Sequence, residues 1–185
     1  AAFVMRTNTL TIEGLECSGI KVSDRNGACI RQEQGTVNLS GVYFHHSQNG
    51  LLSHVESRAL NVWDSVFYAN GQGQRGRTHN IYVNGGALNF IRSYSLGAVR
   101  EGHELKTRGD RSLIEDSVIA SFNSQDSRQI DITADGRHVI RNNLIQQGPF
   151  SSNQDVLAVG LEMKAKSERS DNEVLVEGNL FYLER

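Results

Sequence analysis

The 185-residue chain is poor in several features, and each shortage excludes a class of protein. It has no run of about 18 apolar residues, which excludes a transmembrane helix, so we expect no membrane partner. Its 19 basic and 21 acidic residues give a formal charge of −2. Such a balance provides no basic field for non-specific nucleic-acid binding, so no nucleic-acid partner is expected. Pro149 is the only proline beside 18 glycines, which favours many turns built without proline.

Cysteine is also scarce, and the chain lacks the usual beginning of a complete protein. Cys17 and Cys29 are too few for a disulfide framework, so we expect them to be buried free thiols. Residues 1–6 include no initiator methionine at position 1 and do not have the shape of a signal peptide. We therefore expect residues 1–185 to form one domain that is part of a longer chain.

The clearest pattern in the sequence is a repeat of eight residues. Seven copies begin at positions 10, 37, 60, 88, 112, 138 and 174, which differ by 27, 23, 28, 24, 26 and 36 residues. The third position of the template is apolar in every copy. The fifth is Gly, Asp or Asn except at Arg92, and these residues tolerate turns and left-handed backbone. Each copy is therefore predicted to form a strand, a bend and a second strand.

A third strand is predicted between successive copies of the template. Several of these segments alternate apolar and polar residues, as in His79–Val83, His103–Thr107 and Gln129–Thr133. Three short strands in each repeat of about 25 residues indicate an all-β fold, a right-handed parallel β-helix of about seven coils. A leucine-rich repeat has a similar period, but the third position here mixes Ile, Leu, Val and Phe, and most bends carry Gly or Asp.

The repeats resemble the right-handed parallel β-helix proteins of the pectate-lyase-like superfamily. More narrowly, THNIYV at 78–83 followed by GHELKTR at 102–108 resembles a bacterial group with HNIYV-type and GHxLKSR-type strands. Members of the superfamily are mostly associated with acidic polysaccharides, as lyases, hydrolases, epimerases or phage tailspikes. The resemblance implies an extracytoplasmic bacterial protein whose partner is an acidic polysaccharide, although a fold alone does not choose an activity.

Alternation along the third strand of each coil predicts which side chains face outward. With Leu105 facing inward, Lys106 and Arg108 face outward on the same coil. Neighbouring coils lie about 4.8 Å apart, so outward side chains of successive coils form columns. We expect one column to contain His54, Tyr82, Lys106 and Asp131 and a second beside it to contain Asn80, Glu104 and Gln129.

Other side chains are expected on the inward side of the same row. Val55 is predicted to face inward in the second coil, which places His54 outside. His79 and His103 also fall on the inward side, where we expect them to be stacked structural histidines.

The outward cluster is suited to an acidic sugar. Arg108 is a candidate clamp for a uronate carboxylate, and neutralising that carboxylate acidifies the adjacent C5 proton. Lys106 is the candidate base, and Tyr82 or His54 the candidate acid. Arg75 and Arg77, in the Gly-rich loop at 71–77, are candidates to grip an anionic substrate. We therefore expect binding of an acidic polysaccharide, with β-elimination or C5 epimerisation as the leading reactions.

The superfamily resemblance extends to these roles only in part. Some alginate and chondroitin lyases of this fold carry an acidic–x–Lys–Ser/Thr segment similar to residues 104–107, which implies a catalytic role for Lys106. Their second catalytic arginine is expected near residues 131–133, where this chain has none. These lyases place acidic residues around Ca²⁺, and the corresponding candidates here are Glu104, Asp131 and Glu162.

A non-catalytic function remains open as an alternative at this point. Outward Lys, Glu, Arg and Asp on adjacent rungs also form solvated charge ladders without catalytic function. The chain is then a non-catalytic stalk, adhesin or tailspike-like module, and a fibre of this kind is expected to be a trimer. A hydrolase is disfavoured, because no tight pair of outward aspartates lies on the central strands.

Overall fold

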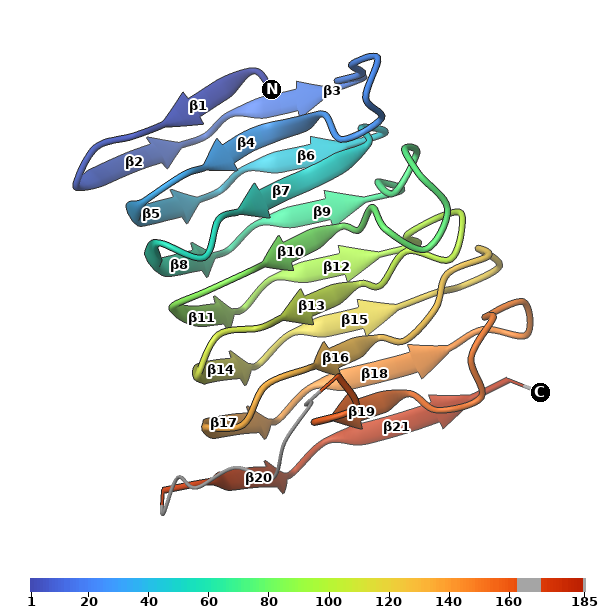
Figure 1. The fold of residues 1–185 in the computed structure, drawn as a ribbon. Coiled ribbons are helices and arrows are strands. Elements are labelled where there is room, and N and C mark those ends of the chain that lie inside the picture. Colours follow the sequence, from blue (N-terminus) through green and yellow to red (C-terminus); the bar gives the residue numbers. More distant parts are fainter. Residues whose placement is uncertain (163–170, 185) are drawn as a thin grey trace.

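The protein is an all-β parallel solenoid, as the repeats predict. The computed structural model describes residues 1–162 and 171–184, and this part of the chain contains strands but no helix. Three parallel sheets of seven strands each run the length of the molecule, and Figure 1 shows the coils stacked in chain order. Accordingly, no helix in the described ranges is long and apolar enough to cross a bilayer. Three strands in each turn also distinguish the fold from a leucine-rich repeat.

Each coil contributes one strand to each sheet. Sheet A contains β1 (Phe3–Met5), β4 (Ala28–Gln32), β7 (Asn49–Ser53), β10 (Ile81–Val83), β13 (Leu105–Thr107), β16 (Ile130–Ile132) and β19 (Leu157–Val159). Sheet B contains β2 (Thr9–Glu13), β5 (Gly35–Ser40), β8 (Ser57–Trp63), β11 (Ala87–Ile91), β14 (Arg111–Glu115), β17 (Arg137–Arg141) and β20 (Glu173–Glu177). Sheet C contains β3 (Glu16–Ser18), β6 (Tyr43–His45), β9 (Val66–Tyr68), β12 (Tyr94–Leu96), β15 (Val118–Ala120), β18 (Leu144–Gln147) and β21 (Leu180–Leu183).

The eight-residue template spans a strand of sheet B, a bend and a strand of sheet C. Its first position pairs from coil to coil through all seven copies, beginning with Leu10 opposite Val37 and Val37 opposite Leu60. Its eighth position is likewise continuous from Cys17 to Phe181. The register predicted from the repeat is therefore confirmed for two of the three sheets.

The bend at the fifth template position uses left-handed backbone in every coil. The φ angles range from +46° at Arg92 to +62° at Gly178, with Asp64, Asp116 and Asn142 between them. Serine or asparagine side chains at the sixth position satisfy the backbone of the preceding coil. For example, the N–H of Val42 donates to Oγ of Ser65 at 3.1 Å. The same bond recurs through the later coils, so the bends are stacked by a ladder of side-chain oxygens.

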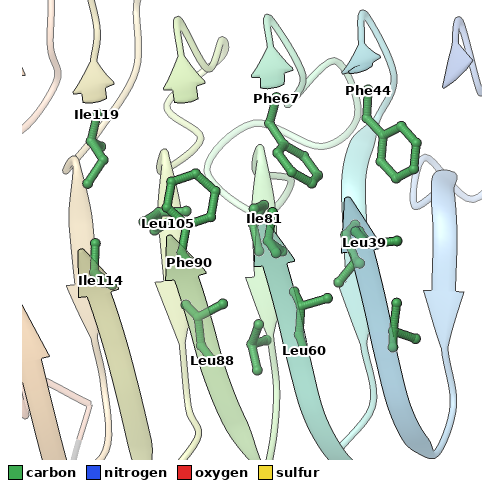
Figure 2. Packing of buried hydrophobic residues seen from close by; sticks show 14 of the residues in the cluster. Leu39, Phe44, Leu60, Phe67, Ile81, Leu88, Phe90, Leu105, Ile114 and Ile119 are labelled. Atoms are coloured by element: carbon green, nitrogen blue, oxygen red, sulfur yellow. The ribbon is translucent and has the colours of Figure 1, made fainter. Parts of the chain in front are cut away.

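The core fills the interior of the solenoid and runs along its axis. Phe44 and Phe67 pack edge to face with ring centroids 5.4 Å apart, and Phe90 lies next in line (Figure 2). In the fourth coil the eighth template position is Ser95, which is fully buried. The large Phe90 at the third position of that coil compensates for the small serine, where the third coil has Val62 and Phe67. The aromatic side chain thus moves from the eighth to the third template position between these two coils, and all four side chains are fully buried.

The two cysteines are not free thiols, which corrects the expectation from their number. Cys17 on β3 and Cys29 on β4 form a disulfide with a Cα–Cα distance of 6.0 Å. The bond closes the 19–27 loop, which connects β3 of sheet C to β4 of sheet A. Two cysteines cannot form a framework, yet a single bridge across one corner needs only two suitably spaced residues.

Candidate functional site

A cavity of about 570 Å³ lies over sheet A where two long corner loops meet the strands. Its floor includes Leu52, Tyr82 and Lys106, which occupy paired positions on β7, β10 and β13. Arg108, just beyond β13, and Glu162, beyond β19, complete its rim. The cavity is therefore formed by residues that are distant in sequence and that stacking brings together.

The walls of the cavity come from the 19–27 and 69–80 loops, which lie on the corner side of the solenoid, at the right in Figure 1. The two loops pack so closely that there is no room for a side chain at Gly73. A Cβ atom there would lie 2.2 Å from the carbonyl oxygen of Arg25. The side-chain oxygen of Gln48 holds the 19–27 loop by accepting hydrogen bonds from the backbone N–H groups of Val22 and Gly27. The walls are thus ordered by packing and hydrogen bonds rather than by regular secondary structure.

A chain of ion pairs runs along the floor. Nζ of Lys106 lies 2.9 Å from Oδ2 of Asp131 and 2.6 Å from Oε1 of Glu162, and the side chain of Lys106 is only 9% exposed. Arg108 pairs with the other oxygen of Glu162 and lies over the ring of Tyr82, with Cζ 5.3 Å from the centroid. The ammonium group thus lies between two carboxylates and donates a hydrogen bond to Glu162.

The outward row on sheet A contains Tyr82, Lys106 and Asp131 in direct register, as the alternation predicts. His54 does not belong to this row. Leu52 pairs with Tyr82 instead, so His54 lies two residues further along, in an adjoining hollow that shares Leu52 and Tyr82 with the cavity. The predicted inward residue Val55 is 61% exposed, while Leu51 is fully buried. The register expected for the second coil was therefore wrong by two residues.

The second predicted column is also wrong, because Asn80, Glu104 and Gln129 are completely buried. Each of them precedes the first residue of its strand, so strand alternation does not apply there. Nδ2 of Asn80 and Oγ of Ser95 donate to Glu104, and Nε2 of Gln129 donates to Asp126. These residues form a polar network inside the corner rather than a surface that binds substrate.

The interior carboxyls of this network differ from surface acids in their protonation. Burial raises the pKa of Glu104 well above its usual value, and the neighbouring charge of Asp126 raises it further. Burial also raises the pKa of Asp126 to about 6, against the lowering effect of hydrogen bonds from Ser121 and Ser151. Two acids that share one enclosed site thus bind a proton more readily than surface acids do.

His79 and His103 are buried and stacked, as predicted, with ring centroids 5.0 Å apart. They do not point into the apolar core, however, since His79 lines the cavity and Nε2 of His103 lies 3.3 Å from Asp131. Nδ1 of each ring accepts a backbone N–H, from His103 and Arg128 respectively, so the neutral rings carry their proton on Nε2.

Burial, with repulsion from nearby positive charges, keeps both rings uncharged. Desolvation is the main cause in each case, and it lowers the pKa of His79 well below the usual value. For His103 desolvation outweighs the attraction of Asp131, and the pKa falls to about 4. At neutral pH the two histidines therefore act as N–H donors and have no free basic nitrogen at Nδ1.

The cavity carries a net positive charge. Its charged lining comprises four cationic side chains and two carboxylates, which leaves an excess of two positive charges: Arg25, Arg77, Lys106, Arg108, Asp24 and Glu162. Arg75 and Arg77 were both candidates for binding an anionic substrate. Arg77 lines the cavity, whereas Arg75 does not line it and pairs with Glu101 at 2.5 Å. Sequence reasoning missed Asp24 and Arg25, because nothing in the repeat indicates that the 19–27 loop reaches sheet A.

The three carboxylates proposed for Ca²⁺ do not converge on one point. The oxygens of Glu104 accept hydrogen bonds from Asn80, Ser95 and the backbone of Ala98, and Asp131 and Glu162 share the ammonium of Lys106. Within residues 1–162 and 171–184 no group of three or more His, Cys, Asp or Glu side chains is arranged to hold a metal ion. As arranged here, a lysine takes the position between the two outward carboxylates.

Comparison with known proteins adds no assignment. No protein-family description, no curated protein and no solved structure matches the chain.

Proposed function

We propose that the protein binds an acidic, uronate-containing polysaccharide in the cavity over sheet A. The observation that carries this proposal is the cavity's lining of four cations against two carboxylates. Arginine and lysine are the side chains that hold carboxylates by charge-assisted hydrogen bonds, and a volume of about 570 Å³ accommodates more than one sugar ring. The resemblance of the sequence repeats to the pectate-lyase-like superfamily supports the same ligand class, as an analogy only.

Glu162 indicates where a sugar carboxylate would bind. Its two oxygens separately accept hydrogen bonds from Lys106 and Arg108, which is the geometry of a clamped carboxylate. Glu162 is 40% exposed at its side chain, so a ligand can displace it without opening the core. In the bound state, the uronate carboxylate takes the place of Glu162 between the two cations.

β-Elimination or C5 epimerisation is the reaction that we propose for this site. In an elimination, the base takes the C5 proton, the electron pair of the C–H bond forms the C4–C5 double bond, and the bond from C4 to the glycosidic oxygen breaks. Tyr82 donates the proton to that leaving oxygen, and Lys106 serves as base once it has released its own proton.

The competing proposal is a non-catalytic binding module such as a stalk, adhesin or tailspike-like fibre. The buried pair between Lys106 and Asp131 favours it, because both charges are already paired within the stack of β13 on β16 without a sugar. Light scattering separates a fibre-like trimer from other states, and an assay for unsaturated uronate products separates binding from cleavage.

We also propose an extracytoplasmic location. The disulfide between Cys17 and Cys29 supports it, since such bonds persist mainly in oxidising compartments. Peptide mapping of protein purified from its source under thiol-blocking conditions tests the bond, and recovery of both cysteines as blocked thiols would contradict this location.

Titration calorimetry with oligomers of alginate, pectate and a glycosaminoglycan tests the binding function. We expect at least one to bind the full chain, and Arg108→Gln to lower the affinity by about tenfold or more. Arg111→Gln is the matched control, because Arg111 is an exposed arginine of sheet B outside the cavity. Absence of binding to all three polymers, or equal losses in the two variants, would overturn the proposal.

Cleavage is tested by the ultraviolet absorbance of unsaturated uronate with the same polymers. We expect Tyr82→Phe to bind as the unmodified protein does and to form product more slowly. Product formation at an unchanged rate in Lys106→Met would discard the elimination mechanism while leaving the binding proposal intact.

A further inference from the structure

A second hollow, of about 400 Å³, lies on sheet B. It spans β2, β5 and β8 and the bends that follow β8 and β11. Its lining includes a tryptophan with several polar side chains: Glu13, Asn38, Ser40, Trp63, Asp64 and Arg92. None of these residues lines the cavity over sheet A, so the two are separate sites.

The hollow follows from the register of one outward column. Glu13, Ser40 and Trp63 occupy paired positions on successive strands, so a small serine lies directly beside the only tryptophan of the chain. A serine next to an indole leaves a depression whose wall is the aromatic ring. In the described part of the chain the indole N–H has no hydrogen-bond partner, which leaves it available as a donor.

Arg92 is the one residue that departs from the rule of the fifth template position. It adopts φ = +46°, where the other six copies have Gly, Asp or Asn. Its guanidinium makes two hydrogen bonds of 2.9 Å with the two oxygens of Asp64, in the coil before it. The left-handed backbone itself recurs in the bend of every coil, so what distinguishes Arg92 is its long cationic side chain at the rim of the hollow.

The polar groups around the indole are oriented rather than free to rotate. Asn38 donates one N–H to Thr11 and accepts a hydrogen bond from Nδ2 of Asn61 at 2.8 Å. These two bonds fix the direction of its second N–H. The bidentate pair likewise fixes the guanidinium of Arg92 and leaves its remaining N–H groups available. Fixed donors and acceptors beside an aromatic face are suited to recognising hydroxyl groups.

The charge of the hollow excludes the ligand of the other site. Glu13 and Asp64 against Arg92 give a net charge of −1, whereas the cavity over sheet A carries an excess of two positive charges. An acidic sugar is therefore repelled here and attracted there. A net charge of −1 disfavours an anion, and the oriented hydrogen-bonding groups favour a ligand rich in hydroxyl groups.

We propose that this hollow is a binding site for a neutral oligosaccharide, with the ring of Trp63 as the platform on which a sugar ring stacks. The apolar C–H face of a pyranose packs on the indole, while Asn38, Asp64 and Arg92 exchange hydrogen bonds with its hydroxyl groups. The site does not depend on the function of the cavity over sheet A, because the two share no residue.

The intrinsic fluorescence of the protein tests the proposal directly, because Trp63 is the only tryptophan. The probes are cellohexaose, mannohexaose, xylohexaose and maltohexaose, each titrated to about 5 mM, a range suited to weak sugar sites. We expect at least one to change the emission of Trp63 in a saturable way. No change with any of the four, or an equal response to an oligouronate, would overturn the assignment.

Variants then locate the site by calorimetry with the sugar that responds. We expect Trp63→Ala to lower the affinity by about tenfold or more and Trp63→Phe to lower it by about threefold or less. Arg92→Asn is expected to lower the affinity several-fold and still to fold, because Asn142 adopts the same backbone in the equivalent position.

Tyr94→Ala is the matched control, since Tyr94 is an exposed aromatic residue on sheet C. Equal losses in Trp63→Ala and Tyr94→Ala would overturn the proposal. Trp63→Ala must also leave oligouronate binding unchanged, and this keeps the failure of one site distinct from the failure of the other.

Discussion

Two ion-pair clusters on different faces of the solenoid show how burial changes the role of the same chemistry. On sheet A, the side chains of Lys106 and Asp131 are 9% and 3% exposed, and on sheet B those of Arg92 and Asp64 are 56% and 52% exposed. Both pairs link adjacent coils at hydrogen-bond distance. The buried pair is part of the folded stack, because losing one partner strands a charge, whereas the exposed pair mainly shapes a surface.

The largest expected effect concerns stability. Lys106→Met leaves the carboxylate of Asp131 buried with only His103 beside it, and we expect a loss of about 3–5 kcal/mol in the free energy of unfolding. Urea denaturation measures it. Arg92→Asn is the control on the exposed pair and is expected to leave the urea midpoint unchanged. Similar midpoints for both variants would contradict the distinction drawn between the two pairs.

Salt is expected to separate the two proposed ligand sites. Binding of an oligouronate over sheet A depends on charge, so we expect its affinity to fall by about tenfold between low and high salt, as the Debye length shortens from about 30 Å to about 3 Å. Binding of a neutral sugar at Trp63 should stay within about twofold over the same range. Calorimetry at several salt concentrations checks both, and parallel salt dependences would show that the sites do not differ in charge recognition.

Removing the negative charge of Glu162, the protein's own carboxylate in the cavity, should strengthen ligand binding. Glu162→Gln abolishes the charge that competes with a uronate for Lys106 and Arg108, and we expect an affinity about fivefold higher for the oligouronate. Glu115→Gln, which disrupts an ion pair with Arg141 on sheet B, is the control and should have no effect. A weaker affinity in Glu162→Gln would mean that this carboxylate assists the ligand instead of mimicking it.

An enclosed and an exposed acid are also expected to differ in how their contribution to stability depends on pH. Burial raises the pKa of Asp126 to about 6, above its unfolded value, so its contribution to stability is complete below the unfolded pKa and is lost as the pH rises through about 6. The hydrogen bond from Arg92 lowers the pKa of Asp64, so its contribution is present at neutral pH and is lost on acidification.

Thermal melts between pH 4 and 8 distinguish the two acids. We expect Asp126→Asn to gain several degrees relative to the unmodified protein as the pH rises from 4 to 8. Asp64→Asn should show no such gain. A constant difference between Asp126→Asn and the unmodified protein across this range would mean that Asp126 keeps an ordinary pKa.

The fold was predictable wherever the chain repeats itself, and the site only in part. The template fixes the register of sheets B and C, because a bend with left-handed backbone recurs at one position in every coil, including the unfavourable Arg92. Sheet A follows corner loops of variable length, so its register in the second coil could not be counted from the template. This is why Leu52, and not His54, lies beside Tyr82.

The misplaced residues have a common physical cause. Asn80 and Glu104 were assigned by extending strand alternation one residue beyond the strands, into a corner where the chain turns inward. Tyr82, Lys106 and Asp131 lie within three-residue strands, where alternation holds. Residues of the cavity wall, such as Arg25, depend on contacts between loops, which have no signature in the periodicity of the sequence.

The disulfide has a consequence for the cavity over sheet A. Asp24, Arg25 and Asn26 line that cavity, and they lie within the loop that Cys17 and Cys29 close. Oxidation restricts the conformations of this loop before any ligand arrives, and a ligand that holds the loop in turn favours the oxidised form. Affinity for an anion and the reduction potential of the cysteines are therefore thermodynamically linked. A reducing environment should lower the affinity of the cavity for an anionic ligand.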